Sequence, residues 1–400
     1  MKNDNLQNDD SRIDPSSVFF KAWIALCLIY PLTILVSIAA TNLILVPIVI
    51  GAIVFRREFT DASLKTFSVL VLAYLVWSLI AVMLSPYDHH WSSWVEERSV
   101  FLAILPGLVI GSDIKRVIRS FRYVSVYLFI IAIYATLQYW SGINWVDGKA
   151  LHISQNHFRA QGLQNNALTF AGMIALSMPL TVAVWRQNSI VSGLAILSGA
   201  FSGLASMSRA IMLGFIGGGS LITLLGTNRF RIFGALLVVL MLVLPRTLFV
   251  SRMGEKDETR LYIYKSTVEI IKHHALTGVG ENNWRPAFAK YGLEYDHKNW
   301  PPTHAHSDIL TCTVENGLIG TLIFLALWGY IMSAILKSLL RSKELRRDIL
   351  AGIFTSLAMI LFAGLFQNFQ TDAENALLLW FVVGMGMRLA INTDMIKGDQ

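Results

Sequence analysis

Long runs of apolar residues, separated by short polar stretches, make up most of this chain. A helix that crosses a bilayer needs about 20 mostly apolar residues, because each residue adds 1.5 Å and the hydrocarbon is about 30 Å thick. The pattern therefore predicts an all-α, polytopic membrane protein with about twelve transmembrane helices. The predicted spans lie near residues 18–38, 41–55, 65–84, 99–112, 120–140, 165–185, 189–205, 209–226, 230–250, 307–338, 347–367 and 374–391. The tenth is long enough to be tilted or to extend beyond the bilayer.

The composition agrees with a membrane protein. Hydrophobic residues make up 54% of the chain and charged residues only 15%, whereas a soluble domain carries roughly a quarter charged residues. This balance excludes a soluble enzyme, a disordered tail protein and a secreted disulfide scaffold. The two cysteines, Cys27 and Cys312, lie in or beside apolar runs. Neither therefore indicates a disulfide or a metal pair.

The distribution of charge predicts the orientation. Lys and Arg, which outnumber the acidic residues by 33 to 26, concentrate in short loops on one side of the predicted membrane. The positive-inside rule places those loops in the cytoplasm, together with both termini. All nine histidines fall on the opposite, outer side. The basic stretches are thus topology signals and not a nucleic-acid footprint, and any chemistry is expected at the outer face.

We interpret residues 1–400 as a single membrane domain with one long outer loop, residues 251–306, between the ninth and tenth spans. This loop contains an amphipathic helical pattern, with an apolar stripe formed by Leu261, Tyr264, Val268 and Ile271. A Gly-x-Gly sequence follows in residues 277–284. Because it comes after a helix and not a strand, it predicts a tight turn and not a dinucleotide-binding loop.

Two residues at span ends are candidates for chemistry. His306 lies where the long loop enters the tenth span; it would either accept a proton from a sugar hydroxyl or cap a helix at the interface. Arg209 opens the eighth span. Its planar guanidinium suits a phosphate clamp, and a snorkelling arginine is the structural alternative.

Three further positions have both a functional and a structural interpretation. Arg260 lies on the apolar stripe of the loop helix, where a phosphate contact and an ion pair with Glu255 or Glu258 are both open. Arg159 precedes the sixth span beside several side-chain amides, which suit either sugar hydroxyls or an N-cap and loop. Asp372 joins the last two spans, where it would orient a histidine, contact a sugar or lie in a solvated turn.

No spacing typical of a metal site is present. The histidine pairs at 89–90 and 273–274 are adjacent in sequence, so their side chains do not face one another on a helix. The chain has no HxxxH or HExxH spacing and no Cys/His cluster. We therefore expect no metal ligands and no cofactor. A nucleophile elbow and a Walker-type phosphate loop are also missing from the sequence.

The stretch from His306 reads His-Ser, nine residues, Gly317, two residues, Gly320. This spacing resembles the signature of bacterial O-antigen ligases, which is His, then Asn, Ser or Gln, nine residues, Gly, two residues, then Gly, Thr or Tyr. SRA at Arg209, ETR at Arg260 and the Gly-x-Gly turn before the histidine agree in order and place. The similarity covers essentially the whole chain, with the specific motifs mainly in residues 205–320.

The resemblance implies a glycosyltransferase of lipopolysaccharide biosynthesis that uses neither a nucleotide sugar nor a metal. Such an enzyme moves O-antigen polysaccharide from undecaprenyl pyrophosphate to a sugar hydroxyl of lipid A–core, with inversion, at the periplasmic face of the bacterial inner membrane. Carried over by motif, His306 would be the base, and Arg209 and Arg260 would bind the pyrophosphate. The further substrate-binding candidates are Arg159, His304 and Asp372.

Two alternatives stay open. One is an O-antigen polymerase, or another lipid-linked oligosaccharide transferase of the same superfamily, with similar chemistry and a different acceptor. The other is a transporter or flippase, which would place polar groups near the membrane midplane on broken helices. Here polar residues gather at one face and no repeat is visible, except that Glu315 and Asn316 fall deeper along the tenth span. These two would line a cavity for the lipid pyrophosphate or pack helices together.

Overall fold

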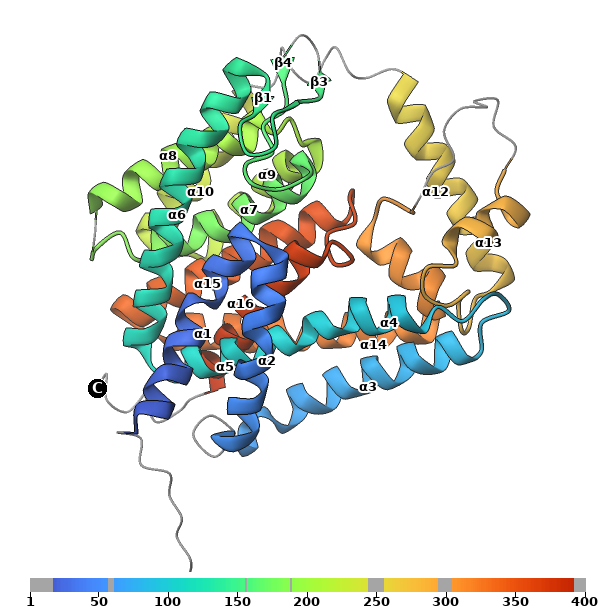
Figure 1. Cartoon of the computed structure of the whole chain (residues 1–400), viewed down its shortest axis with the longest axis horizontal. Helices are drawn as coiled ribbons and strands as arrows, with labels where there is room; N and C mark the ends of the chain where they lie inside the picture. The colour runs from blue at the N-terminus through green and yellow to red at the C-terminus, as the bar shows by residue number, and fades with distance from the viewer. Residues whose placement is uncertain are drawn as a thin grey trace, which may run out of the picture.

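A computed structural model describes residues 17–56, 61–154, 157–187, 189–243, 255–293 and 304–391. Both chain ends, for which a cytoplasmic location is predicted, lie outside these residues, and so do parts of the predicted outer loop, 251–254 and 294–303. Helices dominate the described part, so the prediction of an all-α protein is confirmed (Figure 1).

Each predicted span coincides with helix in the described residues. The main helices are α1 (Val18–Val36), α2 (Ile38–Val54), α3 (Lys65–Met83), α5 (Ile104–Gly111), α6 (Ile114–Ser141), α7 (Ala167–Ala183), α8 (Ser189–Ala205), α9 (Arg209–Leu225), α10 (Asn228–Val243), α14 (Asp308–Arg341), α15 (Glu344–Gly364) and α16 (Ala373–Ile391). Among the described residues, six helices are long and apolar enough to cross a membrane, and four shorter apolar helices accompany them. The protein is therefore a multi-pass membrane protein. The count of about twelve spans stays a prediction.

Smaller elements connect these helices. They are α4 (Trp91–Ser99), α12 (Glu255–His273), α13 (Trp284–Tyr291) and the 3-10 turns η2 (Ala62–Leu64) and η3 (Val100–Ala103). Two antiparallel hairpins, which the sequence did not predict, lie between α6 and α7. They pair β1 (Ile143–Asn144) with β2 (Lys149–Ala150), and β3 (Ile153–Ser154) with β4 (His157–Phe158).

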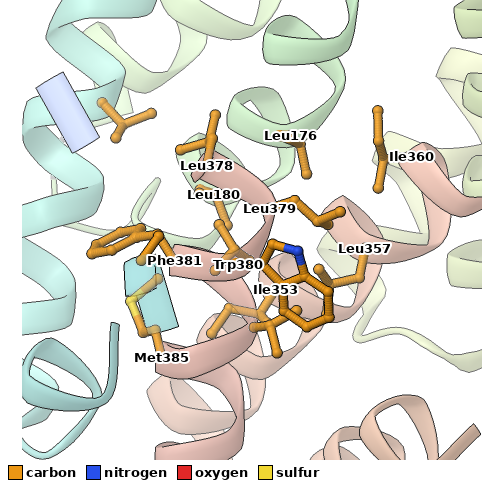
Figure 2. Packing of buried hydrophobic residues seen from close by; sticks show 14 of the residues in the cluster. Leu176, Leu180, Ile353, Leu357, Ile360, Leu378, Leu379, Trp380, Phe381 and Met385 are labelled. Atoms are coloured by element: carbon orange, nitrogen blue, oxygen red, sulfur yellow. The ribbon is translucent and has the colours of Figure 1, made fainter. Parts of the chain in front are cut away.

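The centre of the bundle is built by α7, α15 and α16. In the most apolar 18-residue stretch of α15 and of α16, 83% of the residues are buried. The corresponding share for the helical segment that contains α3 is 28%. Figure 2 shows their side chains interlocking around Trp380. Gly384 brings α16 close to α5, since a Cβ added there would lie 2.3 Å from the carbonyl oxygen of Ile104. Small residues at such contacts let helix backbones approach closely.

Helix α14 is broken at Gly317. This residue has φ 66° and ψ −175°, a combination essentially reserved for glycine, and a Cβ there would lie 2.1 Å from the carbonyl oxygen of Leu276. Three backbone hydrogen bonds replace the helical ones that the break removes: Val279 N–H to Val314 O (2.7 Å), Gly280 N–H to Glu315 O (3.0 Å) and Leu318 N–H to Ala275 O (2.7 Å). The tenth predicted span is thus long because it joins two helical halves.

The described part of the predicted outer loop is folded. Helices α12 and α13 pack together and against the start of α14, around a small core that includes Ile263, Ile270, Trp284 and Val314. Figure 1 shows this pair of helices at one side of the bundle. The turn between them, with φ of 75° at Gly278 and 82° at Gly280, is the one predicted from the Gly-x-Gly sequence.

Candidate functional site

A cavity of about 750 Å³ opens at one end of the bundle. Its walls come from the beginnings of α7 and α9, from α12, from the residues before α14 and from the connection between α15 and α16. Six of its lining residues are those singled out in the sequence: Arg159, Arg209, Arg260, His304, His306 and Asp372. Other polar residues that line it are His152, Asn166, Ser208, Thr259, Gln367, Asn368 and Thr371. Segments distant in the sequence therefore meet around one space.

The ring of His306 is held in one orientation. Its Nδ1 lies 3.2 Å from the side-chain oxygen of Gln367, and because that oxygen only accepts, the contact assigns the ring proton to Nδ1 and the lone pair to Nε2. The backbone of His306 has a left-handed φ of 51°, and the hydroxyl of Tyr264 donates to its carbonyl oxygen (3.2 Å). These contacts leave Nε2 as the proton-accepting atom.

His306 is neutral at physiological pH. Burial, together with the neighbouring His304 and Arg260, lowers its pKa from 6.5 to about 4, although the hydrogen bond with Gln367 acts in the opposite direction. Burial also lowers the pKa of His304, whose ring meets that of His306 edge to face, with 4.1 Å between the centroids. A neutral imidazole can accept a proton, which an imidazolium cannot.

Arg209 and Arg159 lie on the same wall of the cavity. Arg209 is the first residue of α9, and the preceding Ser208 caps that helix by accepting from the N–H of Ile211. The guanidinium of Arg159 donates through Nε to the carbonyl oxygen of Ser206, at 2.9 Å. Asn166, one of the side-chain amides beside Arg159, is the N-cap of α7, so this segment forms the N-cap that its structural interpretation predicts. The positive end of the α9 dipole and two arginines thus border the same space, which suits an anion.

Arg260 enters the cavity wall from a different helix, α12. It extends from α12, and its Nη1 donates to the carbonyl oxygen of Phe366 at 3.3 Å. The alternative ion pair concerns Glu255 and Glu258, whose side chains lie outside the described residues. Arg260 therefore links the outer-loop helix to the α15–α16 connection while lining the cavity.

Asp372 has a structural role as well as a place in the cavity wall. Its carboxylate accepts hydrogen bonds from Thr169 Oγ1 (2.5 Å), from the backbone N–H of Asn375 (3.1 Å) and from the side chain of Asn375 (3.0 Å). These bonds join α7 to α16. Burial nevertheless raises the pKa of Asp372 to about 6.

Sequence reasoning missed Asp308. Its Oδ1 accepts the backbone N–H groups of Phe369 (2.8 Å) and Gln370 (3.0 Å). This buried carboxylate fixes the α15–α16 connection against the start of α14, and it thereby places Gln367 beside His306. The only sequence signal was an acidic residue in the first turn of a helix, which is a common capping position.

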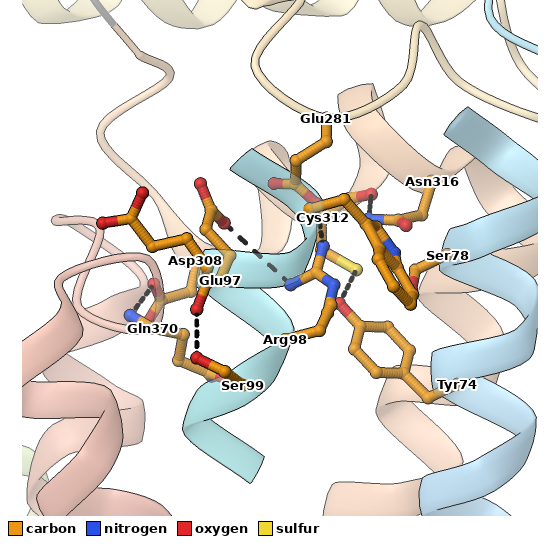
Figure 3. Close-up of polar contacts among 12 residues, drawn as sticks. Tyr74, Ser78, Glu97, Arg98, Ser99, Glu281, Asp308, Cys312, Asn316 and Gln370 are labelled. Atoms are coloured by element: carbon orange, nitrogen blue, oxygen red, sulfur yellow. Dashed lines mark hydrogen bonds and ion pairs between the residues drawn. The ribbon is translucent and has the colours of Figure 1, made fainter. Parts of the chain in front are cut away.

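A buried polar cluster lies beside the cavity (Figure 3). Arg98 forms an ion pair with Glu281 and lies 4.0 Å from Glu97. Ligand atoms of Glu97, Glu281 and Glu315 lie within 4.8 Å of one another. Such a set of carboxylates can also bind a divalent cation, but here Arg98 already supplies positive charge.

This cluster decides between the two interpretations of Glu315. Glu315 lines a separate cavity of about 30 Å³ and is not among the residues that line the larger one. Asn316 donates to Cys312 O (3.3 Å), and its own carbonyl oxygen accepts from Trp77 (2.8 Å). Of the two interpretations, the described contacts of these residues fit the packing of helices.

Residues 193–325 match the family model described as O-antigen ligase. The resemblance to this family is thereby confirmed. The matched region contains Arg209, Arg260, His306 and both signature glycines, whereas Arg159 and Asp372 lie outside it. The family implies a glycosyltransferase-like ligase or polymerase that acts on lipid-linked polysaccharide. The comparison with curated proteins finds no match.

Proposed function

We propose that this protein is an O-antigen ligase of lipopolysaccharide biosynthesis. It transfers O-antigen polysaccharide from undecaprenyl pyrophosphate to a sugar hydroxyl of lipid A–core. The observation that carries the proposal is the meeting of the signature histidine with Arg209 and Arg260 around one cavity, within the part of the chain that matches the family. The cavity, at about 750 Å³, has the size of typical small-molecule sites.

His306 is the general base in this proposal. Nε2 accepts the proton of the acceptor hydroxyl as its oxygen attacks the anomeric carbon of the donor sugar. The bond between that carbon and the pyrophosphate oxygen breaks at the same time, and the anomeric centre inverts. The contact of Nδ1 with Gln367 supports this role because it leaves Nε2 unprotonated.

Arg209 and Arg260 stabilise the leaving group. Pyrophosphate gains negative charge as the bond breaks, and preorganised guanidinium groups favour that charge in the transition state. Their origin in two different helices, α9 and α12, that line the same cavity supports binding by both. We assign Arg159, His304 and Asp372 to substrate binding. No metal or other cofactor enters this mechanism.

The proposed topology follows from the charges. Both termini and the arginine-rich end of the bundle lie in the cytoplasm, and the cavity opens to the periplasm from the inner membrane. The domain division is also part of the proposal: residues 1–400 form one membrane domain, and residues 251–306 form its large periplasmic loop.

A lipopolysaccharide gel of a strain lacking the gene, probed for O-antigen and core, tests this proposal. We expect bare core, with O-polymer accumulating on the carrier lipid. Core that carries a single O-unit would identify a polymerase instead. An unchanged ladder would contradict both assignments and favour a transporter.

A further inference from the structure

A second polar cavity lies at the opposite end of the bundle. It has a volume of about 620 Å³ and forms where α7 and α9 end and where α10 and α15 begin. Helix α9 begins at Arg209, in the wall of the first cavity, and Gly226, directly after its last residue, lies in the wall of this one. The two ends are about 25 Å apart. The charged residues that line it are Arg186, Arg229, Arg231, Arg347, Glu344 and Asp348.

Positive charge dominates this cavity. Of its two carboxylates, Asp348 is engaged, because it accepts from Thr227 Oγ1 (3.0 Å) and pairs with Arg186 (3.7 Å). Within the described part of the chain, Nε of Arg347 is buried and has no hydrogen-bond partner. The four arginines thus outnumber the two acidic residues, and guanidinium groups are well suited to the oxygens of a phosphate.

An apolar groove continues from this cavity. It has a volume of about 500 Å³ and shares Arg229 with the polar cavity. Its other walls come from α7, α8 and α10 and from the residues directly after α7. The apolar residues that line it include Val182, Trp185, Ile196, Leu197, Phe233 and Leu236. Trp185 lies near the junction, where tryptophan is favoured at a membrane–water interface.

We propose that the two cavities together bind one anionic phospholipid. The phosphate lies among Arg229, Arg231 and Arg347, and an acyl chain lies along the groove. A free phosphate would not use the groove, and a zwitterionic lipid would not match the excess of arginines. The positive-inside rule assigns this end of the bundle to the cytoplasmic leaflet, where anionic lipids are available. The inference is independent of the proposed ligase reaction.

Native mass spectrometry of the purified full-length protein in detergent tests this site with phosphatidylglycerol and phosphatidylcholine as probes. We expect the unmodified protein to prefer phosphatidylglycerol. The double variant Arg229→Gln/Arg231→Gln is expected to bind phosphatidylglycerol roughly tenfold more weakly, with little change for phosphatidylcholine. Arg341→Gln, at an exposed position at the end of α14, is the matched control and should retain binding.

A second variant separates a lipid from a free anion. Gly193 lines the groove, and its added Cβ would lie 3.2 Å from the ring of Trp185, so Gly193→Phe fills the groove without changing charge. We expect this variant to bind phosphatidylglycerol several-fold more weakly. Equal binding of the two lipids to the unmodified protein would overturn the proposal. The proposal would also be overturned if Gly193→Phe bound phosphatidylglycerol as tightly as the unmodified protein and inorganic phosphate displaced that lipid.

Discussion

The ring nitrogen Nδ1 of His306 lies 3.2 Å from the side-chain oxygen of Gln367. These residues come from different segments, one before α14 and the other after α15. Asp308 keeps them together because its carboxylate holds the backbone of Phe369 and Gln370. The orientation and the tautomer of the proposed base therefore depend on the segment between α15 and α16. This segment contains none of the residues of the histidine signature.

Gln367 should act as a positioning residue. Gln367→Leu removes the acceptor for Nδ1, and we expect kcat to fall by about tenfold or more with KM little changed. Gln367→Glu keeps an acceptor and adds a negative charge, which raises the pKa of His306. The acidic limb of the kcat/KM profile should then move to higher pH. A Gln367→Leu enzyme with unchanged kcat and an unchanged profile would refute this role.

The pH dependence of the unmodified enzyme provides a second test. A general base works only when it is deprotonated, so activity rises as pH increases through its pKa. Since burial lowers the pKa of His306 to about 4, the acidic limb of kcat/KM should lie near pH 4, and this group should cause no change around neutrality. Initial rates measured against pH, with circular dichroism to verify folding, check this. A limb centred near 6.5 would mean that His306 is not the buried base described above.

Arg209 and Arg260 should not tolerate lysine. Arg→Lys keeps the charge but loses the planar fork that binds phosphate through two hydrogen bonds. Losing one charge-assisted hydrogen bond costs about 1.5–3 kcal/mol, so we expect each variant to ligate roughly 10- to 100-fold more slowly. Arg341→Lys, exposed at the end of α14, is the control and should retain activity. Full activity of Arg209→Lys and Arg260→Lys would argue against pyrophosphate binding by these residues.

The break in α14 should require glycine at position 317. Gly317→Ala places a Cβ 2.1 Å from Leu276 O at a left-handed φ, and we expect a loss of about 3 kcal/mol or more in stability. Gly329→Ala is the matched control in the same helix, because an added Cβ there has no neighbour within 4 Å. It should be neutral or stabilising by up to about 1 kcal/mol. Thermal unfolding in detergent compares the two, and equal stability would contradict a required break.

Hydropathy was sufficient to locate the helices, because each long apolar run can satisfy its backbone only as a helix within a bilayer. The motif spacing identified His306 and both signature glycines, since that pattern is local in sequence. It did not reveal that Gly317 breaks the helix. Nothing in a run of apolar residues shows that the backbone of residues 275–280 inserts there.

The contacts that position the site could not be predicted from the sequence. Arg98 and Glu281 are 183 residues apart, and Thr169 and Asp372 are 203 apart. Each of these residues has a plausible local role, as a surface charge or a cap, so only the tertiary fold selects its partner. The same holds for Gln367, whose amide gains significance only beside His306.

The most direct test of the account is ligation by the purified protein, with lipid-linked O-antigen as donor and lipid A–core as acceptor. His306→Ala should reduce the rate by about 10²- to 10⁴-fold, the typical contribution of a general base, while the protein stays folded in detergent. His157→Ala is the matched control, because His157 is exposed and stacks on Tyr139, with 5.5 Å between the ring centroids; it should ligate normally. Near-normal ligation by His306→Ala would contradict the assignment of His306 as the base.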